Sequence, residues 1–327
     1  MDEQDTRQAI KSKFQRVEPI DTTLQHRIMS QINLEENPHT KERWFMKYKV
    51  SLLLTLGLLL TASTGFAAVK YQSLTNDNGD VLFQERPMTH DTNSNRTEDD
   101  DKRISRMNHI WVNEIKPGEA AIIYIVPNNP NQELYLKANS HIVKDFSTLQ
   151  KMVKIPGKTL AKQIPGKGKE KYTFQKASVH MEHGMDLYKL SETEKADIAN
   201  KLLLEAQASG KDYALMPVPF TDQFWLTTLT YTSGKNKISL DILNSQDTGT
   251  VSASYEGKLN VTSRKINING QDVIQRTLGG GTSEFIWVYE DPKTKFAYHY
   301  FLRAAQGNVS NEDLMRVVKT MIPAVKK

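Results

Sequence analysis

SEFIWVYEDPKTKFAYHYFLRA, residues 283–304, decides the fold, because it has the pattern of one long antiparallel hairpin. Two runs rich in aromatic and β-branched residues flank a polar, turn-forming centre. With residues 291–294 as the loop, Glu290 would pair with Lys295. This register predicts three aromatic pairs on one face of the hairpin: Tyr289 with Phe296, Trp287 with Tyr298, and Phe285 with Tyr300. The face is then either core packed against a helix or the floor of an apolar ligand groove.

The segments around this hairpin extend the pattern into a larger sheet. Between residue 210 and the C-terminal helix the chain contains only strand-like runs. Ser191 and Glu194 form a capping box that starts a helix over residues 192–208, and Ser310 caps another over 311–321. Farther upstream, NHIWVNEI and EAAIIYIVP are expected to be strands. Helices set apart from a long antiparallel run of strands predict an α+β architecture.

The longest uncharged run, within KYKVSLLLTLGLLLTASTGFAAVKYQ at residues 47–72, predicts a membrane span. Residues 50–69 carry no charge, and a helix of that length extends about 30 Å, the thickness of the hydrocarbon core. The small residues Gly65, Ala67 and Ala68 resemble a signal-peptide cleavage site, and a buried helix of a soluble protein is a third interpretation. We favour a retained transmembrane helix, because a signal peptide begins with a short basic stretch and not with a long preceding segment.

The charges on either side of this run predict its orientation. Basic residues gather on its N-terminal side: Lys41, Arg43, Lys47 and Lys49. Because positive charge stays in the cytoplasm, we expect a single-pass protein of the cell membrane with a cytoplasmic N-terminus and an extracytoplasmic C-terminal domain. Residues 73–106 are polar and poor in apolar side chains, which favours a stalk. The predicted parts are a cytoplasmic helical segment (1–49), a transmembrane helix (50–69), a flexible stalk (70–106) and an extracytoplasmic α+β domain (107–327).

Residues 1–46 have the pattern of two short amphipathic helices, each too short to be stable alone in water. The second begins at the N-cap Asp21, and four apolar residues share one of its faces: Leu24, Ile28, Met29 and Ile32. Either the helices rest on each other or on the membrane, or this face fits a groove on a cytoplasmic protein. These four residues are the predicted partner-binding site.

The composition limits the chemistry. The chain of 327 residues has no cysteine, which excludes disulfides, zinc–thiolate sites and cysteine nucleophiles. Its formal net charge of +5 does not indicate direct binding of nucleic acid. His180 and His183 stand three positions apart, which on a regular strand directs them to opposite faces and predicts no metal site. No serine or carboxylate pair has a catalytic spacing, so we predict no enzyme and no cofactor.

The segment 151–176 is strongly basic, with eight lysines and a single acid, Glu170. Its IPGKT motif lacks the first glycine of a phosphate-binding loop, because position 152 is Met, and therefore predicts no nucleotide site. The lysines form either a solvated surface or a contact for anionic lipid headgroups or wall polymers. The candidates for that contact are Lys158, Lys162, Lys167 and Lys169.

Several segments resemble a known class of proteins. VEPIDTTLQHRIMSQI, followed by a basic juncture and one apolar run, resembles the single-pass membrane-tethered anti-sigma-factor-like regulators of Gram-positive bacteria. FIWVYEDPKTKFAYHYFLRAAQGNVSNEDLMRVVKTMI, IKPGEAAIIYI and IPGKGKEKYTFQKASV resemble an uncharacterised ectodomain family, a domain of unknown function, in such proteins. The resemblance implies a sigma factor as the cytoplasmic partner and no catalytic residue. The N-terminal segment departs from this class, because it is shorter than usual and lacks a His/Cys zinc motif.

These observations predict a fold class: α+β, with a largely antiparallel β-sheet ectodomain and a few packed helices, preceded by one transmembrane helix. They also predict a membrane-anchored regulator whose ectodomain senses or binds an unidentified envelope component, while the cytoplasmic helices bind a partner such as a sigma factor. The alternative is an anchored envelope-binding or chaperone module with no signalling role.

Overall fold

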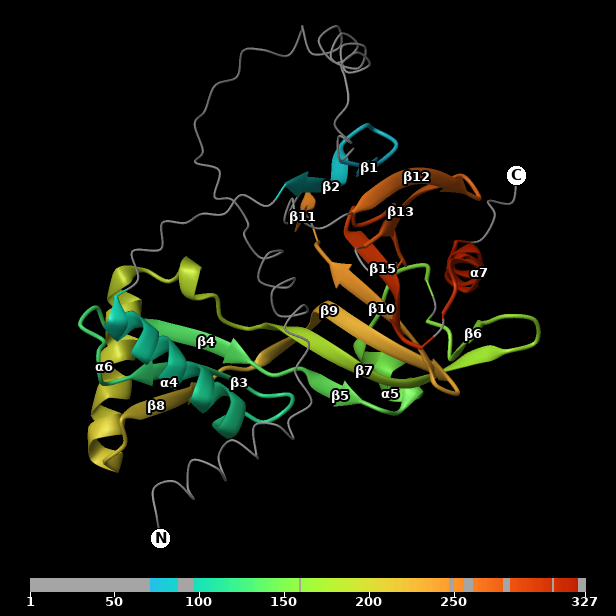
Figure 1. Ribbon diagram of the computed structural model, residues 1–327. Helices are drawn as coiled ribbons and strands as arrows, with labels where there is room; N and C mark the ends of the chain where they lie inside the picture. Colours follow the sequence, from blue (N-terminus) through green and yellow to red (C-terminus); the bar gives the residue numbers. More distant parts are fainter. Residues whose placement is uncertain are drawn as a thin grey trace, which may run out of the picture.

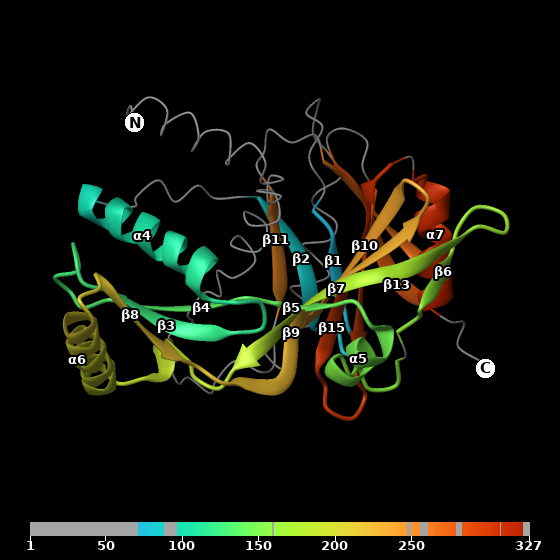
Figure 2. The same cartoon turned by 90° about the horizontal axis from the view of Figure 1, so that it is seen from below.

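The computed structural model describes residues 71–87, 97–158, 160–246, 250–255, 261–278, 283–307 and 309–322. These residues form three β-sheets and four α-helices. Figures 1 and 2 both show one large sheet, with a small sheet and two helices at one end and the β6–β7 hairpin at the other.

The large sheet carries most of the fold. Its strands run in the order β12-β13-β14-β15-β10-β9-β7-β5, and β6 also pairs with β7. Every neighbouring pair in it is antiparallel. The strands are β5 (His141–Val143), β6 (Gln163–Pro165), β7 (Lys171–His183), β9 (Phe220–Ser233), β10 (Asn236–Asn244), β12 (Thr262–Ile268), β13 (Gln271–Thr277), β14 (Ser283–Glu290) and β15 (Ala297–Gln306).

One face of the large sheet, here called the inner face, holds the main core. Leu229, Tyr231 and Leu240 point to this face and are almost completely buried. Two helices cover it: α5 (Phe146–Met152), through Leu149, and α7 (Asn311–Met321), through an apolar stripe that includes Val317. The opposite face is called the outer face below.

The C-terminal hairpin is present, but the predicted register is wrong by two residues. Glu290 pairs with Ala297 and not with Lys295. The aromatic partners are therefore Tyr289 with Tyr298 and Trp287 with Tyr300, and Phe285 pairs with Leu302. Trp287 and Tyr300 stack with ring centroids 4.9 Å apart and an angle of 7° between their planes. The face itself was predicted correctly, because a shift of two residues preserves the alternation of a strand, and it is core beneath α7.

A second, three-stranded sheet lies against the outer face of β13, β14 and β15. It contains β1 (Ser73–Thr75), β2 (Val81–Pro87) and β11 (Val251–Tyr255), and β11 runs parallel to β2. Its core residues Leu74 and Phe83 are almost fully buried against Ile286 and Phe301. The predicted flexible stalk at 70–106 is therefore corrected, since part of it is packed into the domain.

The third sheet contains β3 (Ala120–Ile125), β4 (Leu134–Ala138) and β8 (Tyr213–Pro217), with β3 in the middle. Helix α6 (Glu192–Ser209), preceded by a short 3-10 turn (Leu187–Lys189), packs on one face, and α4 (Glu98–Glu114) packs on the other. The capping box of Ser191 and Glu194 at the start of α6 was predicted correctly. Residues 108–115, which were expected to form a strand, belong mainly to α4, because Met107 and Ile110 bury one helical stripe on the sheet.

The described fold is α+β, and the fold-class prediction is corrected in its membrane component. No helix within the described residues has both the length and the apolar character needed to cross a bilayer. The run at 50–69, where the transmembrane helix was predicted, lies outside the described residues.

Candidate anion-binding surface

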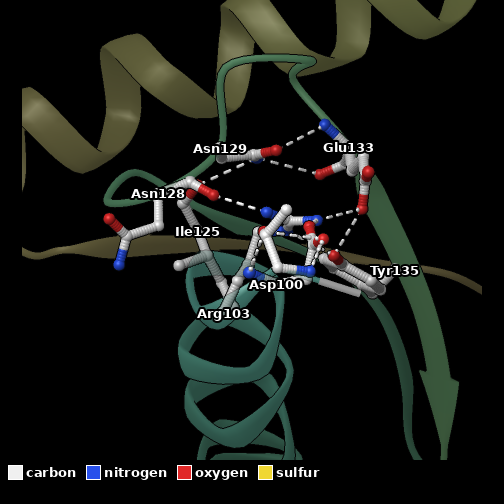
Figure 3. Close-up of polar contacts among 8 residues, drawn as sticks. Asp100, Arg103, Ile125, Asn128, Asn129, Glu133 and Tyr135 are labelled. Atoms are coloured by element: carbon white, nitrogen blue, oxygen red, sulfur yellow. Dashed lines mark hydrogen bonds and ion pairs between the residues drawn. The ribbon is translucent and has the colours of Figure 1, made fainter. Parts of the chain in front are cut away.

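Figure 3 shows a polar cluster around a buried arginine of α4, at the end of the molecule that holds the β3–β4–β8 sheet. This end is called the small-sheet end below. The side chain of Arg103 is 4% exposed. Its Nη2 atom lies 2.6 Å from the Asp100 carboxylate and 2.8 Å from that of Glu133, and its Nε donates to the Tyr135 hydroxyl at 2.6 Å. Its Nη1 donates to the Asn128 carbonyl oxygen at 2.5 Å.

The partners of Arg103 come from α4 and from the loop and strand that follow β3, so the cluster fixes the helix on the sheet. Burial alone would lower the pKa of Arg103, but hydrogen bonds to Tyr135, Asp100 and Glu133 outweigh it and raise the pKa. Because each edge of the guanidinium already meets a protein acceptor, we assign this cluster a structural role.

A row of charges crosses the outer face of the large sheet. The pairing places Arg276 opposite Glu284 and Glu284 opposite Arg303. Arg276 is in ion-pair contact with Glu284, and Arg303 Nη2 lies 3.1 Å from the Asp241 carboxylate. Glu85 of β2 adds a carboxylate 3.8 Å from Arg276. The row alternates in sign and is buried over most of its length, so it joins strands rather than presenting a charged surface.

His180 and His183 of β7 each pack on an aromatic ring. Irregular pairing around Met181 and His183 removes the simple alternation that was assumed for β7. The ring of His180 packs on Trp225 at 5.3 Å, and that of His183 stacks on Phe220 at 6.0 Å. Burial lowers the pKa of His180 to about 4, which keeps it neutral near pH 7. Among the described residues, no group of three or more His, Cys, Asp or Glu side chains could hold a metal ion.

A buried serine–histidine contact also lacks the features of a catalytic pair. Ser245 Oγ lies 3.0 Å from His299 Nε2, but it also donates to the Ala297 carbonyl oxygen at 3.0 Å. The His299 ring is completely buried, its Nδ1 atom has no hydrogen-bond partner, and burial lowers its pKa to about 3. An imidazole of that pKa is a poor proton acceptor at neutral pH, and no acid of the described residues bonds to its Nδ1 atom. The contact therefore belongs to the packing between the sheets.

The four lysines predicted to contact an anionic surface do not form one patch. The Lys158 Nζ atom lies 4.4 Å from the centre of the Tyr289 ring, and burial lowers its pKa. Lys158 also lines a pocket of about 300 Å³ with the apolar side chains of Val153, Ile155 and Leu160. Lys162 is exposed beside β6.

Lys167 and Lys169 lie together in the turn between β6 and β7, which protrudes at the far end of the large sheet in Figures 1 and 2. Both are exposed, and neither has a carboxylate within 4.0 Å among the described residues. The one acid of this turn, Glu170, accepts a hydrogen bond of 2.5 Å from the Ser233 hydroxyl. The turn therefore presents positive charge at the tip of the molecule.

The sequence analysis missed a second set of polar residues, on the outer face beside this turn. Gln163 pairs with Thr173, Thr173 with Thr232, and Thr232 with Lys237, which gives one row across β6, β7, β9 and β10. The next row contains Lys176, Thr230 and Ser239. The only signal in the sequence was the alternation in TLTYT at residues 228–232, where every second residue is threonine.

The predicted partner-binding residues Leu24, Ile28, Met29 and Ile32 lie outside the described residues. Comparison with known proteins adds no family to this geometry. No protein-family model matches the chain, and neither a curated protein nor a solved structure matches it significantly.

Proposed function

We propose that this chain is a regulatory protein of the cell membrane. Its α+β domain lies outside the cell and binds an anionic component of the envelope, and residues 1–49 bind a cytoplasmic protein such as a sigma factor. The exposed lysines of the β6–β7 turn are the observation that carries the proposal. Each cationic side chain near an anionic surface contributes about 1 kcal/mol of binding free energy.

The inner face of the large sheet supports this proposal by elimination. Its aromatic residues on the C-terminal hairpin had two interpretations, core packed against a helix or the floor of an apolar ligand groove. Helices α5 and α7 cover this face with apolar side chains, so it is core. The β6–β7 turn is exposed and basic, and it is distant from the β3–β4–β8 sheet. A large anionic partner can therefore reach it.

Replacing both Lys167 and Lys169 with Gln is expected to weaken binding to an anionic partner about 10- to 30-fold, because two favourable charge contacts are lost. The full chain would be immobilised, and its binding to phosphatidylglycerol vesicles and to a soluble poly(glycerol phosphate) would be measured at low salt. The matched control is Lys116→Gln with Lys201→Gln, since both lysines are exposed but lie in the small-sheet end. An equal loss in both double variants would mean that net charge, and not this turn, determines binding.

Replacing Ile28 with Asp is expected to abolish capture of a cytoplasmic partner, because a charge would interrupt the apolar face formed with Leu24, Met29 and Ile32. Tagged full-length protein would be isolated from membranes and its bound proteins identified. The control is Ser30→Asp, which adds the same charge on the opposite face of the predicted helix. Identical partners for both variants and the unmodified chain would refute the proposed contact.

The alternative function, an anchored binding module without signalling, is separated by a deletion. Without residues 2–40 a binding module would still complement a strain that lacks the protein, whereas a regulator would not. Complementation by the truncated chain would therefore favour the alternative.

A further inference from the structure

The outer face of β6, β7, β9 and β10 has an unusual composition. Along β9, Thr228, Thr230 and Thr232 all point to this face, while Leu229 and Tyr231 point into the core. On both sides the paired residues are polar or charged, namely Thr173, Lys176 and Ser178 on β7 and Lys237, Ser239 and Asp241 on β10. Among the described residues, α5 and α7 pack on the inner face, the β1–β2–β11 sheet packs over β13 to β15, and α4 and α6 pack on the third sheet.

The spacing of a β-sheet turns these side chains into a regular array. Neighbouring strands are about 4.8 Å apart, and alternate residues on one strand are about 6.8 Å apart. Threonine hydroxyl groups therefore recur across β7 and β9, on either side of a bulge between Phe174 and Lys176. The side chains of Thr173, Thr230 and Thr232 are half-buried and have no hydrogen-bond partner within the described part of the chain.

The charge of this face is positive. Lys171, Lys176 and Lys237 have no carboxylate within 4.0 Å among the described residues, and the acid on the same face, Asp241, is held by Arg303. Hydroxyl groups alternating with cations suit a ligand that carries both negative charge and its own hydroxyl groups. Because the threonines and lysines extend over the three strands β7, β9 and β10, the face suits a ligand that is extended rather than compact.

We propose that this outer face binds an extended polyol-phosphate polymer, with the lysines on the phosphate groups and the threonine hydroxyls on the phosphate oxygens and polyol hydroxyls. This inference rests on the proposed function and specifies the chemistry of the anionic component and the surface that holds it. We call the threonine and lysine side chains of this face the Thr–Lys array. The array adjoins the basic turn at Lys167 and Lys169, so one polymer can contact both.

A bilayer is the competing partner, and the geometry favours the polymer. The β6–β7 turn protrudes beyond the sheet in both views, so a bilayer would meet this turn first. The short threonine side chains lie close to the sheet surface, where a flexible polymer reaches them more easily than a fixed plane of headgroups does. Loss of the threonine hydroxyls should therefore affect polymer binding and leave vesicle binding unchanged.

The test is the double variant Thr230→Val with Thr232→Val in the full chain. Valine keeps the shape and β-branching of threonine and removes only the hydroxyl group, so the sheet should persist. We expect at least a tenfold loss of affinity for poly(glycerol phosphate) with no change for phosphatidylglycerol vesicles. Lys176→Gln with Lys237→Gln should give a similar loss. Thr262→Val is the matched control, since Thr262 is exposed on the distant strand β12.

The outcomes separate this inference from the proposed function. Unchanged polymer binding in both double variants, with thermal unfolding like that of the unmodified chain, would overturn the array and leave the proposed function standing. Binding of vesicles but not of polymer by the unmodified chain would also overturn it and identify the membrane as the partner. If the unmodified chain bound neither, both proposals would fail.

Discussion

Replacing Trp287 with Ala is expected to lower the free energy of unfolding by about 3–5 kcal/mol, because it empties the centre of the main core. The indole is 3% exposed and stacks almost parallel on Tyr300 across the β14–β15 pair. It belongs to the same apolar cluster as Leu314 and Val317 of α7, so the cavity would loosen the helix as well as the sheet. The stacked geometry adds about 0.5–1.5 kcal/mol beyond the buried area.

Chemical denaturation followed by circular dichroism measures this change. Tyr188→Ala is the control, since Tyr188 is 94% exposed and its truncation should change the stability by less than about 0.5 kcal/mol. A similarly small effect for Trp287 would mean that the hairpin face is not core. The alternative interpretation of that face, the floor of an apolar ligand groove, would then be favoured.

The hairpin shows how far sequence periodicity determines a strand pair. Alternation identified the aromatic face correctly, but the loop length came from local turn preference and was too short. The Asp291 carboxylate accepts hydrogen bonds from the amides of Lys293 and Thr294, and Lys295 adopts a left-handed φ of 62°. These contacts close a six-residue loop, which the residue types alone did not distinguish from a four-residue loop.

Helix α4 was missed because the sequence features that mark its start are short and consist of polar residues. The acidic run at residues 98–101 resembled a disordered stalk, whereas it is the first turn of a helix with acidic residues at its positive end. Thr97 and Asp100 form a capping box there, which the sequence does contain. The sequence could not show that Arg103 contacts Glu133 and Tyr135, because these partners are about thirty positions away along the chain.

The candidate site illustrates a different limit. Lys167 and Lys169 are close in sequence, so their basic turn could be predicted. The Thr–Lys array joins side chains from three strands, and Lys176 and Lys237 stand far apart along the chain. Only the pairing register brings them to one face, and register is set by turns and bulges that periodicity does not reveal.

The second large effect is expected at the buried charge row on the outer face. Arg276 and Glu284 are 5% and 2% exposed at their side chains and are in direct contact. Arg303 lies 3.8 Å from the same carboxylate. Replacing Glu284 with Leu removes the negative charge between two arginines, which should cost about 3–5 kcal/mol of unfolding free energy. Glu98→Gln, in an exposed pair with Lys102, should cost at most about 1 kcal/mol.

The double variant Arg276→Met with Glu284→Leu distinguishes a mutually compensated pair from two independent contributions. If each charge is tolerated only because the other is present, removing both should cost less than removing Glu284 alone, since the buried guanidinium of Arg276 is then gone too. Arg303 retains Asp241 at 3.1 Å, and the buried Glu85 carboxylate, which also faces Arg276, retains hydrogen bonds from Gln72 N and Ser263 Oγ. Unfolding free energies of the two single variants and the double variant give the coupling directly. Additive losses would mean that Arg276 and Glu284 stabilise the sheet separately, and the row would then be a set of unrelated contacts.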